Sequence, residues 1–89
     1  MNDDEIYKYA AGVRSRIDFV KFVELLNVNF EHDGGRWENN DLKSFLAGLS
    51  GFAQNMGGYY KNMGEEVDVE SVTWRMAAQM LLAASVYGG

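Results

Sequence analysis

The sequence lacks cysteine entirely, and none of its 89 residues belongs to a long apolar run. Without cysteine no disulfide scaffold can form, and this absence is compatible with a reducing compartment. No apolar stretch approaches the roughly 20 residues that a membrane-spanning helix needs. The first five residues, Met1 to Glu5, are acidic where a signal peptide would be basic. We therefore expect a cytoplasmic protein with a single domain over residues 1–89 and no membrane association.

Basic residues are also few: 8 Lys and Arg stand against 13 Asp and Glu, which gives a net charge of −5 at pH 7. Binding to nucleic acid normally needs a stripe of Lys and Arg to neutralise phosphates, so we expect no nucleic-acid partner. The densest acidic group comprises Glu65, Glu66, Asp68 and Glu70. Such a run is either a solvated loop or an acidic docking surface for a basic protein partner.

Residues suited to catalysis or metal binding are scarce. His32 is the only histidine, and its neighbours Glu31 and Asp33 do not converge on one ion as helix ligands at i and i+4 do. No thiol nucleophile exists, and no glycine-rich loop precedes a Lys-Ser or Lys-Thr pair. Glu38 beside Trp37 is either a functional acid in an apolar pocket or an ordinary acid at a helix N-terminus. We expect no enzyme, no cofactor and no metal site.

Hydrophobic spacing predicts two helices in the first third of the chain. Residues 3–12 form a short amphipathic helix. Ser15 is a suitable N-cap for the next helix, with Asp18 in its first turn. Its apolar stripe at helical spacing comprises Phe19, Phe22, Val23, Leu26 and Phe30.

The segment after this stripe allows two interpretations. We expect the helix to end near Phe30 and a loop to follow through Glu38. Asp-Gly and Gly-Gly are also strong turn signals, and apolar residues alternate with polar ones on both sides of Gly34 and Gly35. A small β-hairpin over residues 28–39, which would make the fold α+β, is therefore the alternative.

A central helix is predicted after Asn39 or Asn40, either of which can cap it. Its apolar stripe follows the helical period and comprises Leu42, Phe45, Leu46, Leu49, Phe52, Ala53 and Met56. A second face is built of small residues, namely Ser44, Gly48, Gly51 and Asn55. Each interior glycine costs about 1 kcal/mol relative to alanine. We expect this face to admit either a closely packed neighbour or a bound partner or ligand.

Gly57 and Gly58 weaken or end the central helix, and residues 59–62 can add one further turn. Tyr59 and Tyr60 are adjacent, so they cannot share one helix face. We therefore expect one ring to anchor in the core and the other to present its hydroxyl at the surface.

Thr73 caps a last helix that is apolar on two faces. The expected core face comprises Trp74, Ala77, Ala78, Leu81 and Ala84. The second face comprises Met76, Met80, Ala83 and Tyr87. Such a helix is either nearly enclosed in the monomer or an interface for a homodimer. The whole pattern predicts an all-α fold, a compact bundle of three to four helices.

Several of these motifs carry a resemblance to known proteins. The sequence Trp37-Glu38-Asn39, the run from Met56 to Asn62 that contains Gly58-Tyr59-Tyr60, and the Thr73-Trp74 helix start resemble an uncharacterised family of small bacterial single-domain proteins. That resemblance implies no activity. A looser similarity is to the colicin-nuclease immunity proteins, which are small, acidic, four-helix proteins with a Tyr-Tyr pair near their toxin-binding surface.

The sequence therefore favours a small acidic protein-binding domain, immunity-like or inhibitor-like against a basic protein partner. The expected binding residues are Trp37, Glu38, Tyr59, Tyr60, Glu65, Glu66, Asp68 and Glu70. The alternative is a small-molecule-binding or enzymatic domain with a pocket near Trp37 and Trp74.

Overall fold

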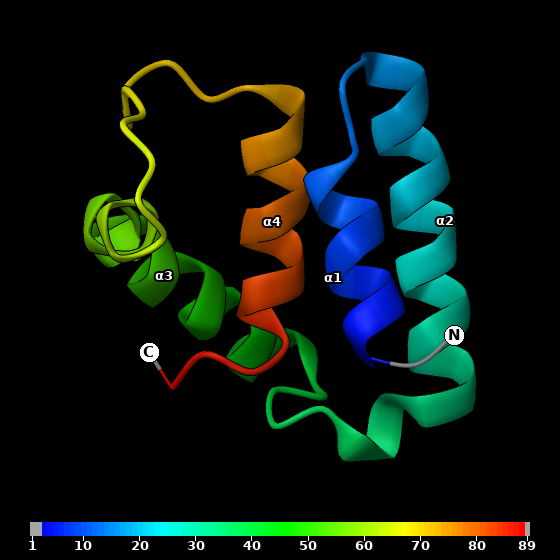
Figure 1. The fold of residues 1–89 in the computed structure, drawn as a ribbon. Coiled ribbons are helices and arrows are strands. Elements are labelled where there is room, and N and C mark those ends of the chain that lie inside the picture. The colour runs from blue at the N-terminus through cyan, green and yellow to red at the C-terminus, as the bar shows by residue number, and fades with distance from the viewer. Residues whose placement is uncertain (1–2, 89) are drawn as a thin grey trace.

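The computed structural model describes residues 3–88, and within them it contains four α-helices, one 3₁₀-helix and no strand. These elements are α1 (Asp3–Ala11), α2 (Arg16–Asp33), the 3₁₀-helix η1 (Gly34–Arg36), α3 (Leu42–Asn62) and α4 (Trp74–Ala84). Figure 1 shows α4 in the middle, with α1 and α2 side by side on one flank and α3 on the other. The prediction of an all-α bundle is confirmed.

Helix α4 divides the core into two clusters. Towards α1 and α2, its residues Ala78 and Leu82 pack with Ile6, Ala10, Val13, Phe22 and Leu26. Towards α3, its residue Met76 packs with Phe52, Met56 and Tyr60, and the half-buried Met80, Ala83 and Tyr87 lie against this second cluster. These last residues with Met76 are the second apolar face predicted for the helix. One apolar face of α4 thus packs against α1 and α2, and the other packs against α3.

The predicted core face of α4 needs two corrections. Leu82, which belongs to neither predicted face, is a buried member of the first cluster. Trp74 is 44% exposed, because it lies at the first residue of the helix, and its ring packs on Phe19 with the centroids 5.3 Å apart. Every other residue of α4 is buried or half-buried. The helix is therefore enclosed within the monomer, and the homodimer interface expected of an uncovered α4 has no basis in this arrangement.

The start of α2 follows the prediction and its end does not. The Ser15 hydroxyl caps the helix by accepting a hydrogen bond from the Asp18 amide at 3.1 Å. The helix then continues to Asp33, and the Trp37 amide donates to the carbonyl of Gly34 at 3.0 Å to close η1. A Cβ atom on the buried Gly34 would lie 2.7 Å from the Phe30 ring. Gly34 therefore lets a helical turn pack closely on this ring, and the alternative β-hairpin is wrong.

Helix α3 is capped by Asp41 instead of Asn39 or Asn40. The Asp41 carboxylate accepts a hydrogen bond from the Ser44 amide at 2.8 Å, and this bond is the main reason that the pKa of Asp41 is lowered. Asn39 is engaged elsewhere: its side-chain amide donates to the carbonyls of Ala84 at 2.8 Å and Tyr87 at 2.7 Å. Its side chain thereby fastens the segment before α3 to the end of α4.

The glycine pair in α3 does not interrupt the helix. The helix passes through Gly57 and Gly58 and ends after Asn62, so the expected extra turn is present and the expected break is absent. Gly64 adopts a positive φ of 76°, and the Glu65 amide donates to the Tyr60 carbonyl at 2.9 Å. This is the Schellman geometry, in which a left-handed glycine terminates a helix.

Among the helices of the described chain, α3 packs against α4 alone. Its second half supplies the buried side chains of the core, whereas Leu42 is 73% and Leu46 51% exposed. The predicted apolar stripe is therefore correct for Phe52 and Met56 and wrong for these two leucines and for the exposed Ala53. The buried Gly48 faces the end of α4: a Cβ atom there would lie 2.6 Å from the Ala84 carbonyl oxygen. Close packing of a neighbour explains this position of the small-residue face.

A candidate protein-binding groove

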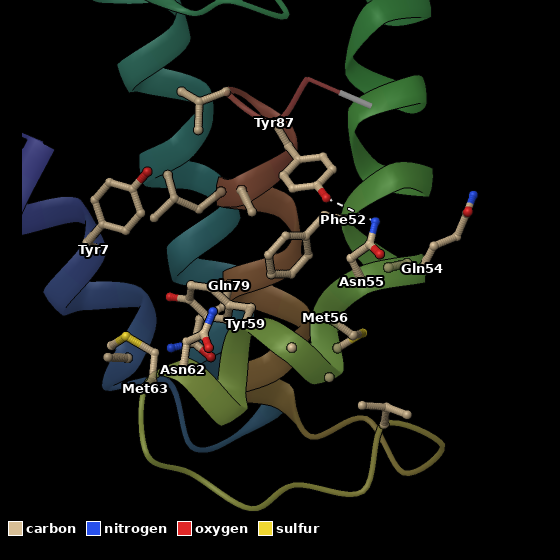
Figure 2. A pocket seen from close by; sticks show the side chains of 18 of the residues that line it. Tyr7, Phe52, Gln54, Asn55, Met56, Tyr59, Asn62, Met63, Gln79 and Tyr87 are labelled. Carbon is tan, nitrogen blue, oxygen red and sulfur yellow. Dashed lines mark hydrogen bonds between the residues drawn. The ribbon is translucent and has the colours of Figure 1, made fainter.

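Because α1 and α3 each pack on α4 without contacting one another, an open groove of about 970 Å³ lies between them. Figure 2 shows α1 on one side, α3 on the other and α4 behind. The α1 wall contains Tyr7, Lys8 and Ala11, and the floor contains Gln79, Leu82 and Ala83 of α4. Val86 and Tyr87 of the C-terminal segment also line the groove. Lys8 is the only charged residue among those that line the groove.

The α3 wall follows from helical periodicity. Phe52, Asn55, Tyr59 and Asn62 recur at i, i+3, i+7 and i+10, and all four line the groove. Figure 2 shows these side chains coming from the same helix beside the opening. This stripe alternates aromatic and amide groups, so the wall offers apolar contact area and hydrogen-bonding groups together.

The aromatic side chains of this wall hold one another in place. The Phe52 ring makes T-shaped contacts with Tyr59 and Tyr87, with centroids 5.3 and 5.7 Å away. The Tyr87 hydroxyl accepts a hydrogen bond from the side-chain amide of Asn55 at 3.0 Å. The C-terminal segment is thereby attached to α3, and the wall is preorganised without a ligand.

Tyr59 and Tyr60 divide between surface and core, as the sequence predicts. Tyr60 is 1% exposed, and its hydroxyl donates to Oε1 of Gln79 at 2.6 Å. Burial raises the pKa of Tyr60 to about 12, despite the Arg75 guanidinium lying 5.6 Å from its ring centroid. Tyr59 is half-buried and lines the groove. In this structure Tyr59 is available to a partner and Tyr60 is not.

The glycine pair lies on the same wall. Gly57 and Gly58 are exposed within α3 and line the groove. A Cβ atom at Gly58 would meet nothing within 4 Å, and one at Gly57 would meet only Val69 at 3.6 Å. Packing inside the domain therefore requires neither glycine, although each costs about 1 kcal/mol relative to alanine. Gly57 faces Val69 of the following loop, whereas Gly58 leaves helix backbone open beside Asn55 and Asn62.

The predicted acidic run is the loop between α3 and α4. Glu65 forms an ion pair with Arg75 at 2.8 Å, and Asp68 accepts a hydrogen bond from the Glu70 amide at 2.9 Å. Glu66, Asp68 and Glu70 are exposed, and none of the ion pairs in the described chain includes them. Val69 from the middle of this loop lines the groove. The loop therefore places negative charge at the rim of the groove.

Trp37 and Glu38 lie at the other end of the domain. The Trp37 indole donates to Oδ1 of Asn29 at 2.8 Å, and its ring packs on Phe30 with centroids 5.0 Å apart. Figure 1 shows this segment, which follows η1, at one end of α4, and the acidic loop at the other. The 11 residues of α4 separate them by about 16 Å. The predicted binding residues thus do not form one continuous surface.

The two tryptophans do not share a pocket. Trp37 lines an apolar depression of about 400 Å³ between α2 and α3, together with Leu42 and Phe45. Trp74 lines a different depression near Arg14 and Thr73. The common Trp37 and Trp74 pocket of the alternative function is therefore not formed. Asn55 belongs to the small-residue face at which the sequence predicts either a packed neighbour or a bound partner or ligand. The residues that sequence reasoning missed are Tyr7, Asn62 and Gln79, and of these only Asn62 could have been indicated, by its helical spacing to Tyr59.

Within residues 3–88, no three His, Asp or Glu side chains are grouped so that they could hold a metal ion. None of the helices described here is both long enough and apolar enough to cross a membrane.

The structure is an all-α bundle with an open groove. A family model described as a family of unknown function, DUF7660, matches residues 15–88, and the chain belongs to this family. No curated protein and no solved structure matches the chain.

Proposed function

We propose that this domain binds a basic segment of another protein in the groove between α1 and α3. The observation that carries the proposal is an open groove lined by three tyrosines, Tyr7, Tyr59 and Tyr87, with an acidic loop at its rim. Tyrosine supplies large contact area and a hydroxyl at little entropic cost, which is why it is frequent at protein interfaces. The opening favours a macromolecular segment over an enclosed small molecule.

The negative charge of the loop favours a positively charged partner. The loop carries three acids without an ion-pair partner, Glu66, Asp68 and Glu70, against the single Lys8 inside the groove. The whole chain has a net charge of −5. A basic partner is attracted by this field, whereas an acidic one is repelled. The proposal includes a cytoplasmic setting, which the absence of cysteine supports, and an inhibitor-like role in which binding masks the basic partner rather than transforms it.

The binding site can be tested with a random peptide library displayed on phage. We expect the selected peptides to combine Lys or Arg with an aromatic or aliphatic residue. Gly58→Trp should weaken their binding at least tenfold because the indole would occupy the groove. Gly58→Ala is the matched control and should leave affinity within about twofold. A selection that enriches no sequence, or peptides that bind Gly58→Trp as well as the unmodified chain, would refute the proposal.

The role of the loop can be tested separately by stopped-flow kinetics with a selected peptide. Replacing Glu66 and Glu70 with glutamine keeps the Asp68 turn and the Glu65 ion pair intact. Association should slow several-fold and depend less on salt, and dissociation should change little. The matched control replaces two exposed acids of α2, Glu24 and Glu31. Equal effects in both pairs would show that net charge, and not the loop, determines association.

A further inference from the structure

We infer that the bound segment is an extended chain of about five residues and not a helix. This inference rests on the proposed function and concerns the same groove. It follows from the length of the groove, from the amide groups that line it and from the bare backbone at Gly58.

The length of the groove sets the length of the segment. The α3 wall runs from Phe52 to Asn62, which is about 16 Å at 1.5 Å per residue. An extended chain advances about 3.3 Å per residue, so about five residues span this length.

The polar groups of the groove suit a chain whose own backbone is unpaired. Oδ1 of Asn55 and Nε2 of Gln79 have no hydrogen-bond partner among the described residues, and neither does the side chain of Asn62. Together these groups offer both donors and acceptors. A helix satisfies its backbone internally, whereas an extended segment presents N–H and C=O groups that lose free energy if they are buried unpaired. Asn55, Asn62 and Gln79 can pair with those groups while Tyr59 contacts the adjacent side chains.

Gly58 allows the segment to lie close to α3. It presents no side chain to the groove, and a Cβ atom there would meet nothing within 4 Å. Asn55 and Asn62 lie about one turn before and one turn after it on the same side of the helix. A backbone that passes over Gly58 comes within reach of both amides, and a large side chain at this position would hold it farther away.

The experiment uses a synthetic copy of the tightest peptide from the phage selection, whose binding Gly58→Trp abolishes. N-methylation of its central amides removes backbone donors without changing any side chain, and it should weaken binding at least tenfold. A version stapled into a helix should also bind at least tenfold more weakly. Asn62→Ala should lower affinity several-fold, whereas Asn27→Ala, on the exposed face of α2, should not. Equal melting temperatures in these two variants would exclude a general structural effect.

The outcomes separate the two proposals. Tighter binding of the stapled peptide, or full tolerance of N-methylation, would overturn the extended conformation and leave the protein-binding function standing. Absence of any peptide sensitive to Gly58→Trp would overturn both.

Discussion

Gly48 offers the sharpest test of the packing of α3 on α4. In a Gly48→Ala variant, the new Cβ would lie 2.6 Å from both the Ala84 carbonyl oxygen and the Asn39 side-chain nitrogen, and 3.0 Å from the Tyr87 carbonyl oxygen. Two of these three atoms belong to backbone and cannot rotate away. The Asn39 nitrogen is in turn the donor to both carbonyls, so a shift of any one atom disturbs the others.

The expected change can be worked out from opposing terms. Overpacking a rigid site costs about 1 to 3 kcal/mol. Distorting the two hydrogen bonds of Asn39 adds about 0.5 to 1.5 kcal/mol for each one that is lost. Alanine returns about 1 kcal/mol through its better helix propensity. If both hydrogen bonds are lost, we therefore expect a net loss of about 1 to 5 kcal/mol. A loss of about 3 kcal/mol, the middle of this range, lowers Tm by roughly 12 to 24 °C in a domain of this size.

Urea denaturation followed by far-UV circular dichroism measures this difference directly. Gly58→Ala in the same helix is the matched control, because its Cβ meets nothing within 4 Å. It should gain about 0.5 to 1 kcal/mol. Asn39→Ala should also cost less in the Gly48→Ala background than alone, since both changes affect the same hydrogen bonds. If Gly48→Ala were as stable as Gly58→Ala, the close approach of α4 to this glycine would be refuted.

Three further predictions concern the core and two titrating groups. Phe52→Ala should destabilise the domain by about 3 to 5 kcal/mol, whereas Leu42→Ala, at a 73% exposed position, should stay within about 0.5 kcal/mol; similar urea midpoints for both would contradict the packing of α3. Because burial raises the pKa of Tyr60 from 10.0 to about 12, its neutral form stabilises the fold below pH 10, and on the order of 2 kcal/mol should be lost as the pH rises from 10 to 12. Tyr60→Phe should lack this loss. If the urea midpoints of the unmodified chain and of Tyr60→Phe changed by the same amount between pH 9 and pH 12, the assignment to Tyr60 would be disproved. The hydrogen bond from Arg75 lowers the pKa of Glu65, so the stability difference between the unmodified chain and Glu65→Gln should be present at pH 7 and shrink on acidification; a difference that persisted at pH 2 would show that the ion pair is not its source.

The sequence was sufficient for features that depend on neighbours along the chain. The Ser15 and Thr73 caps and the division of α4 between two apolar faces are local patterns, and the structure confirms them. The stripes of α2 and α3 are correct only in part, because Val23, Phe30, Leu42 and Leu46 are exposed. Errors arose where a distant contact outweighed a local preference. Asn39 has the chemistry of an N-cap, but the carbonyls of Ala84 and Tyr87 engage its side chain. Gly34 has the chemistry of a hairpin turn, but the Phe30 ring holds it in a helical turn.

The candidate site was less predictable than the fold for the same reason. Tyr59 could be identified because adjacent tyrosines must point in different directions on a helix, but the sequence did not say which ring would be buried. Gln79 decides this, because its amide meets the Tyr60 hydroxyl across the α3 and α4 contact. Tyr7 lies more than 50 residues earlier in the chain, and no periodicity connects it with α3.

The packing of α3 on α4 alone also explains why the groove exists. If α3 were inserted among α1, α2 and α4, it would bury its apolar stripe along its whole length and fill the space beside α1. Helix α3 instead contacts α4 through Phe52, Met56 and Tyr60, and it leaves a groove on the side of α1 and an apolar depression on the side of α2. The same arrangement leaves Leu42 and Leu46 exposed. These exposed leucines and the tyrosine-lined groove therefore have one structural cause, so a substitution that tilted α3 towards α1 should narrow the groove and bury less of the second core cluster at the same time.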